Sequence, residues 1–371
     1  MKPVSRLAIC LSIVLVALFP SIFANAAPNA SAFSVGVRGH VQKLIIGPDG
    51  QHLFAIVKPD GKPRVNDEYG LYVFSLDRPK KPRKIGYAPI ISPMDFAVSK
   101  DGQYVYVMNT SFSGYPRDQP YGLLVFDVSM PAQPKLVGLV SADIFVMHHS
   151  FDGQFLYLQP RNLPIGNVRP QIMVLRANGA TTNYEHCVIT ERRAFDREPI
   201  IAYAFATFPD NKVLAIFDST SNVYLLDADN PCSVKLKRQY RKDNTPPWIA
   251  GGKHNTIYIG GRRLAAYRLA DELELKREYV PTGIFANYHV DERRGLVSAS
   301  HGKRALLFSL DGNLECESYA FTTYVGDAAL SEDGILYVGL LGSLVVVDRR
   351  LRSACALTDR STGRVKGARA G

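Results

Sequence analysis

Three charged residues occupy the same position in different copies of an internal repeat. Lys43, Asp95 and Asp327 each lie six residues before the Asp of an Asp-Gly pair. Opposite charges can pair with each other, and acidic side chains can hold a hard cation through their oxygens. The spacing therefore predicts one of two things: a charged ligand-binding site, or charge pairs that hold neighbouring repeats in register.

Histidines are the other candidate catalytic or metal-binding residues. His149 and His289 lie near the ends of predicted inner strands, where each is either a catalytic base or a satisfied core residue. His148 and His149 are adjacent on a strand, so we expect their side chains to point to opposite faces and not to share a metal. The sequence has no zinc-protease, Cys-x-x-Cys, nucleophile-elbow or phosphate-loop motif. Catalytic residues stay unassigned, no metal site or cofactor is predicted, and a divalent cation at the charged position stays open.

The repeat that carries these positions consists of two short apolar runs joined by a turn. It is clear at residues 45–55, 97–107, 148–158 and 330–338, with weaker copies near 208–211 and 290–295. An Asp-Gly pair between such runs predicts a β-hairpin, because Gly adopts positive φ without steric cost. A further apolar run and a fourth strand follow most hairpins. Four strands per unit indicate a propeller blade.

The predicted fold is therefore all-β, a seven-bladed β-propeller of four-stranded antiparallel blades. The units span residues 40–90, 92–142, 144–199, 200–246, 247–283, 284–322 and 323–357. The fifth unit lacks the Asp-Gly turn, so six or eight blades remain alternatives. Residues 33–37 form a short extra strand that we expect to join the last blade and close the ring. Residues 265–279 are predicted to be strands rather than a helix because they follow a strand pair.

One segment resembles a known family. Residues 122–138, Gly-Leu-Leu-Val-Phe-Asp-Val-Ser-Met-Pro-Ala-Gln-Pro-Lys-Leu-Val-Gly, are similar to the LVIVD repeat of bacterial and archaeal propellers, and residues 71–86 are a second copy. The Asp-Gly hairpins resemble those of the YVTN and lactonase-like seven-bladed families. This resemblance implies a fold and no particular reaction, because such propellers serve as enzymes, scaffolds and binding proteins.

Long loops are expected on the face where the inner strands start, in the first three blades. Tyr and Arg on a rigid scaffold are typical of binding surfaces, although solvated loop polarity is the alternative. The candidate binding residues on these loops are Arg64, Tyr69, Tyr115, Arg117, Tyr121, Arg161 and Arg169.

The amino-terminal residues have the pattern of a signal peptide. Basic residues precede an apolar run from Leu7 to Phe19, and Ala24-Asn25-Ala26 supplies a cleavage site. The run is shorter than the roughly 20 residues that cross a bilayer as a helix. We therefore expect a signal peptide at 1–26, a propeller domain at 27–357, a basic disordered tail at 358–371, a periplasmic or secreted location, and no transmembrane segment after cleavage.

Four cysteines follow the leader: Cys187, Cys232, Cys316 and Cys355. An oxidising compartment permits two disulfides among them, and the sequence leaves all three pairings open, with free thiols as the alternative.

These features favour a non-catalytic binding or scaffold protein, expected to be a monomer, with a protein or small-molecule partner. The first alternative is a lactonase-like hydrolase or lyase that uses Asp95, Asp327 or His149 at the channel mouth. The second is a DNA-binding propeller, suggested by the formal net charge of +10. Nucleic acid is disfavoured as a partner because the basic residues are dispersed, and their densest cluster lies on a predicted outer strand, where charge discourages edge pairing.

Overall fold

The structure of the protein is a computed structural model. It describes residues 33–59, 68–110, 121–150, 153–160, 172–177, 186–189, 202–208, 213–218, 222–230, 232, 234–241, 248–252, 256–260, 264–279, 288–291, 296–309, 317–321, 323–347, 358–359 and 364–365. The predicted signal peptide lies outside these residues. The chain divides into a unit of residues 1–31 and a unit of residues 32–371, and everything below concerns the second unit.

The described residues of this unit form antiparallel β-sheets, and five of these sheets have four strands each. Within each of the five, strands that follow one another in the chain are hydrogen-bonded neighbours, as expected for consecutive hairpins. The first two of these sheets contain β5 (Pro93–Val98), β6 (Tyr104–Asn109), β7 (Gly122–Asp127) and β8 (Lys135–Val140), and β9 (Ile144–His149), β10 (Phe155–Pro160), β11 (Ile172–Arg176) and β12 (His186–Ile189). The next two contain β13 (Ala202–Thr207), β14 (Val213–Asp218), β15 (Asn222–Asp227) and β16 (Lys235–Arg241), and β17 (Trp248–Gly252), β18 (Thr256–Gly260), β19 (Leu264–Leu269) and β20 (Leu273–Tyr279). The fifth contains β21 (Tyr288–Asp291), β22 (Leu296–His301), β23 (Arg304–Ser309) and β24 (Glu317–Ala320).

A sixth sheet joins the two ends of the domain. Its strands lie in the order β25-β26-β1-β2-β3-β4. Their bounds are β25 (Val325–Leu330), β26 (Leu336–Val347), β1 (Phe33–Ile46), β2 (His52–Lys58), β3 (Gly70–Ser75) and β4 (Arg83–Pro89). The first part of β1 pairs with β26, Phe33 opposite Val346, as expected for the extra strand, and its second part pairs with β2.

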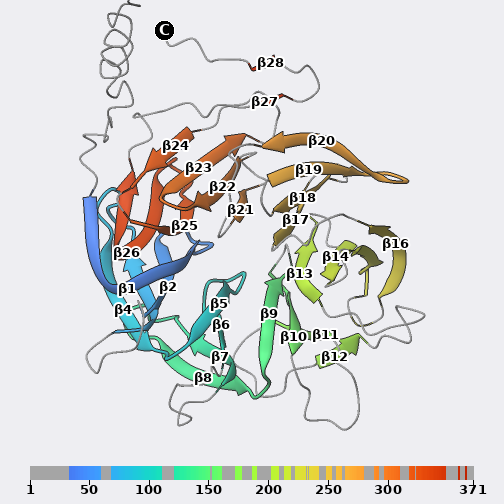
Figure 1. The fold of residues 1–371 in the computed structure, drawn as a ribbon. Coiled ribbons are helices and arrows are strands. Elements are labelled where there is room, and N and C mark those ends of the chain that lie inside the picture. The colour runs from blue at the N-terminus through green and yellow to red at the C-terminus, as the bar shows by residue number, and fades with distance from the viewer. Residues whose placement is uncertain are drawn as a thin grey trace, which may run out of the picture. The chain divides into compact units, whose positions relative to one another are not determined.

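The sheets stand around a common centre (Figure 1), and their first strands face it. Each inner strand contacts the inner strand of the next sheet, from β5 through β9, β13, β17 and β21 to β25, and β1 contacts both β25 and β5. The described strands therefore form a closed, propeller-like ring. The strands β19 and β20 confirm that residues 265–279 are not helical.

The Asp-Gly turns have the predicted conformation. Gly50, Gly102, Gly153 and Gly334 have φ of 67°, 72°, 70° and 77°. In each turn the Gly N–H donates to the carbonyl three residues earlier, at 2.9 to 3.0 Å. Four hairpins therefore share one turn geometry, and this fixes the register of the strands on either side.

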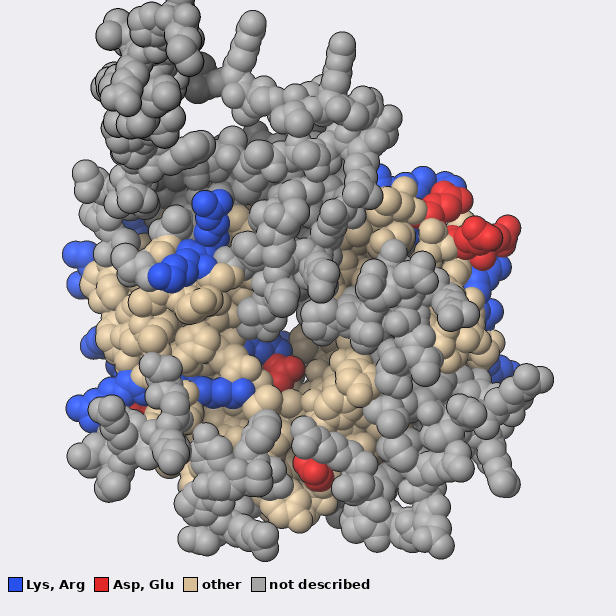
Figure 2. All heavy atoms as spheres, in the orientation of Figure 1, with Lys and Arg blue, Asp and Glu red and all other residues tan. Residues whose placement is uncertain are grey.

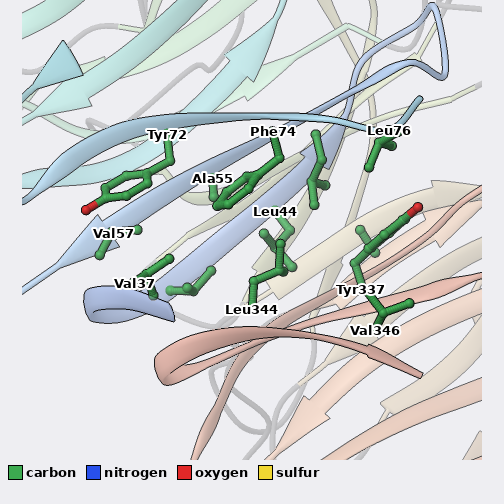
Figure 3. Close-up of a cluster of buried hydrophobic side chains, with 13 residues drawn as sticks. Val37, Leu44, Ala55, Val57, Tyr72, Phe74, Leu76, Tyr337, Leu344 and Val346 are labelled. Atoms are coloured by element: carbon green, nitrogen blue, oxygen red, sulfur yellow. The ribbon is translucent and has the colours of Figure 1, made fainter. Parts of the chain in front are cut away.

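The core lies between neighbouring sheets rather than inside one. In β2, Leu53, Ala55 and Val57 pack in the cluster shared with β25 and β26, whereas Phe54 and Ile56 pack in the cluster shared with β5 and β6. Figure 3 shows the first of these clusters, in which Tyr337 and Leu344 of β26 face Leu44 of β1 and residues of β2 and β3. Both faces of these strands are covered, which is why their sequences are continuous apolar runs.

The predicted tail contains one short ladder. Thr358–Asp359 (β27) pairs with Arg364–Val365 (β28). The rest of residues 358–371 lies outside the described part of the chain.

Candidate functional site

The candidate site is built on a β-bulge at the start of the inner strands. The register of β1 against β2 skips from Val41 to Lys43, and that of β5 against β6 skips from Pro93 to Asp95. The same shift precedes Asp327 in β25. A bulge re-aims the side chains at its position, so equivalent residues of different sheets are presented alike.

Lys43 and Asp95 form an ion pair between β1 and β5. The two side chains are 30% and 27% exposed, so the pair is reached by solvent but partly desolvated. Asp95 also accepts the N–H of Phe96 at 2.8 Å, and the Lys43 ammonium lies 5.7 Å from the centre of the Phe96 ring. Lys43 is therefore held between a carboxylate and an aromatic face, both from the neighbouring sheet.

Asp327 connects a different pair of strands, β25 and β1, and is only 5% exposed. One oxygen accepts the N–H of Leu44 in β1, and the other accepts the N–H of Ala328, both at 2.8 Å. Burial raises the pKa of this carboxyl to about 7, against the lowering effect of these two N–H donors and of Lys43. The structure thus brings Lys43 near both aspartates. The carboxyl group of Asp327 connects β25 to β1 through its hydrogen bonds to Ala328 and Leu44.

Lys58 at the end of β2 is a second lysine at this place. Its ammonium donates to the Met94 sulfur at 3.0 Å. Burial lowers its pKa from 10.5 to about 8, and the nearby Asp95 carboxylate only partly opposes this. Sequence reasoning missed Lys58 because it lies on the second strand, outside the position shared by the three charged residues.

The bulged residues lie at equivalent positions at the start of their inner strands, the end of the ring that we call its mouth. They are Gln42, Met94, Phe145, Tyr203 and Gly326, each one residue before the position of Lys43, Asp95 or Asp327 in its own repeat. The amide of Gln42 reaches the Met94 carbonyl at 3.5 Å. The rings of Phe145 and Tyr203 meet edge to face with centres 5.3 Å apart, and Tyr203 is 45% exposed. Four of the five lie seven residues before an Asp-Gly Asp and Tyr203 lies seven before Asp210, which is the signal that locates them.

Figure 2 shows one face of the molecule, hollowed near its centre. Basic and acidic atoms lie at the edge of this hollow, and apolar or neutral residues surround them.

The two adjacent histidines do not behave as expected. Their rings are parallel, with centres 5.6 Å apart, so the prediction that they point to opposite faces is wrong. The two rings instead stack on each other at the end of β9. Burial, together with His149 and Lys43, lowers the pKa of His148 well below its usual value, and its Nε2 lies 3.3 Å from Thr207 Oγ1. His149 Nδ1 contacts the Ser150 carbonyl at 2.9 Å.

The loop residues are only partly described. Tyr69 is buried, and its carbonyl accepts the hydroxyl of Tyr87 at 2.9 Å, so its side chain is not part of an exposed face. Tyr121 is 47% exposed and precedes β7. Arg64, Tyr115, Arg117, Arg161 and Arg169 lie outside the described residues, as does the side chain of His289.

Other candidate features have structural partners. Cys232 is disulfide-bonded, while the side chains of Cys187, Cys316 and Cys355 lie outside the described part of the chain. In the basic cluster of β16, the Arg238 guanidinium contacts Asp271 of the next sheet at 3.1 Å.

Among the residues that the structure describes, no group of three His, Cys, Asp or Glu side chains is arranged to hold a metal ion. A helix long and apolar enough to cross a bilayer is also absent from this part of the molecule.

Fold and site together define an all-β, propeller-like repeat protein with a charged and aromatic mouth. No protein-family model matches the chain, and none of the curated proteins matches it in sequence. The likeness to LVIVD and YVTN propellers therefore stays a prediction that rests on the repeats described above.

Proposed function

We propose that the protein is an exported, seven-bladed β-propeller that binds a small molecule at the mouth of its ring without transforming it. The proposed blade count is supported by the six-stranded sheet, in which β1 and β26 each change partners along their length. We interpret β25, both halves of β26 and residues Phe33–Gly36 as the seventh blade, and the rest of β1 with β2, β3 and β4 as the first. The five four-stranded sheets complete the ring. Export is proposed from the leader-like amino terminus alone.

The observation that carries the binding role is the half-exposed Lys43–Asp95 pair beside exposed and half-buried apolar side chains. Small-molecule sites typically combine a mostly apolar lining with a few placed polar groups. A protein partner would use the loop residues, which lie outside the described ranges.

Hydrolase or lyase chemistry is less well supported. A carboxyl with a pKa near 7 has the right acidity for general acid–base catalysis. Both oxygens of Asp327 are, however, engaged by backbone N–H groups and buried, so the group is not presented to a substrate. A DNA-binding role is weakened in turn by the pairing of Arg238 with Asp271.

Ligand-observed NMR against a set of small acids, amines and neutral aromatic compounds tests the proposal. We expect the wild type to attenuate the signals of some compounds without generating product signals. Tyr203→Ala should lose this attenuation, because the exposed ring borders the mouth. Leu236→Ala, an equally exposed apolar residue on the outer strand β16, is the control and should keep it.

Product signals would instead establish an enzyme. Binding that survives Tyr203→Ala, or no attenuation for any compound, would contradict a small-molecule site at the mouth.

A further inference from the structure

Lys58 has an unusual environment for a lysine near a protein surface. It is half-buried at the end of β2, opposite His40 of β1. Its ammonium hydrogen-bonds to the sulfur of Met94, a weak acceptor, rather than to a carboxylate. The amine therefore loses water on burial, and the described residues offer it no strong acceptor in return.

The nearest carboxylate is already engaged. Asp95 forms the ion pair with Lys43 and accepts the N–H of Phe96. Among the described residues, the titratable groups next to Lys58 are His40, its cross-strand partner in β1, and Asp95 of β5, which pairs with Lys43. Within this part of the chain, two ammonium groups thus share one partly exposed carboxylate, because Asp327 is buried and held by backbone donors.

The side chains next to this excess positive charge are apolar. Met94 contacts Lys58 directly, and Phe145 and Tyr203 are the equivalent bulged residues in the next two sheets. An acidic group at Lys58 would restore the interactions that the ammonium lost on burial, and the rest of a ligand would lie along apolar surface.

We infer that Lys58 binds the acidic group of a small organic anion whose apolar or aromatic body lies along Met94 and the neighbouring mouth residues. This inference rests on the proposed binding function and specifies its ligand class. Carboxylates and phosphate monoesters share the required chemistry, and the experiment distinguishes them.

Isothermal titration calorimetry with benzoate, phenyl phosphate and benzamide tests the inference. At least one of the two anions should bind, and the neutral amide should bind at least about tenfold more weakly, as loss of one charge-assisted hydrogen bond predicts. Lys58→Met should reduce anion affinity by a similar factor. Lys81→Met, an exposed lysine in the turn between β3 and β4, is the matched control and should not change it.

A proton-linkage measurement gives a second readout. Near pH 8 about half of the Lys58 amines carry a proton, so anion binding should take up roughly half a proton per site, seen as a dependence of the heat on buffer ionisation. Lys58→Met should abolish this uptake, and Lys58→Arg should bind the anion without it. Should Lys58→Met fail to fold, Lys58→Gln replaces it.

Equal binding of benzamide and benzoate, or unchanged anion affinity in the folded Lys58→Met variant, would overturn the inference. If neither anion binds while the NMR set yields neutral or cationic ligands, the anion site is wrong and the binding function stands. If no compound binds at all, the proposed function fails as well.

Discussion

At the scale of single residues, the buried carboxyl group of Asp327 links β25 to β1, and burial raises its pKa. Asp327 accepts N–H groups from both sides of the junction between β25 and β1. Its pKa of about 7 in the fold compares with an ordinary value of 3.8. Between these values the unfolded chain has released a proton that the folded chain retains. The contribution of Asp327 to the free energy of unfolding should therefore be greatest below pH 4 and decrease as the pH rises toward 7.

The corresponding prediction is a pH-dependent free energy of unfolding that depends on Asp327. From about pH 4 to 7 the wild type should lose stability on the order of a few kcal/mol relative to Asp327→Asn. The variant itself should be less stable at low pH, because its amide can accept only one of the two N–H bonds. Urea denaturation at several pH values measures both. His148, whose lowered pKa acts in the opposite direction, cancels in the difference. Parallel pH profiles for the two proteins would contradict the prediction.

The Lys43–Asp95 pair should contribute modestly to stability. Since both side chains are about 30% exposed, we discount its energy for solvent screening. A double-mutant cycle with Lys43→Met and Asp95→Asn should give a coupling free energy of about 0.5 to 1 kcal/mol, read from urea unfolding. A coupling indistinguishable from zero would mean that the pair is retained for its position at the mouth and not for stability.

At the scale of elements, the bulge at the start of the inner strands determines what the mouth can contain. A Cβ at Gly326 would lie 1.9 Å from the Val41 carbonyl oxygen, which belongs to backbone and cannot move aside cheaply. Gly326 thus lets β25 approach β1 closely enough for Asp327 to reach the N–H of Leu44.

Substitution at two glycines separates this close approach from general glycine effects. Gly326→Ala should destabilise the protein by more than about 2 kcal/mol, as strain at a packed backbone contact does. Gly36→Ala, on β1 with no atom within 4 Å of the added methyl group, should be neutral or stabilise by up to about 1 kcal/mol. Melting temperatures compare them, and similar values for the two variants would contradict the assigned role of Gly326.

The elements were largely predictable from the sequence because their signals are local. Asp-Gly turns with glycine at positive φ gave the hairpins, and their spacing placed Lys43, Asp95 and Asp327 at equivalent positions. The existence of the bulges was not predictable, since an extra residue in one strand leaves the apolar pattern of its neighbour unchanged; the seven-residue spacing to the turn gives only their position. The environment of Lys58 and the Phe145–Tyr203 contact depend also on the next sheet, which this spacing does not describe.

At the scale of the whole molecule, the last sheet is completed by the first residues of the domain. Phe33, Ser34, Val35 and Gly36 pair with Val346, Val345, Leu344 and Ser343 of β26. Phe33 and Val35 also pack against the cluster that contains Tyr337 and Leu344. Without this strand the outer edge of β26 would be unpaired, and part of its apolar face would be exposed to water.

Closure by this strand predicts the effect of a short truncation. A chain that starts at residue 38 should unfold at lower urea concentration than one that starts at residue 32, because the buried Val37, the partly buried Phe33 and Val35, and four strand pairs are lost. We expect a loss of a few kcal/mol, since a fully buried side chain contributes roughly 1.5 to 3 kcal/mol and a partly buried one less. Limited proteolysis should then cut first near β26, since the ring opens where its two ends meet. If both chains unfold at the same urea concentration, the added strand does not stabilise the ring. The junction between β25 and β1, which includes the Asp327–Leu44 hydrogen bond, then suffices to keep the ring closed.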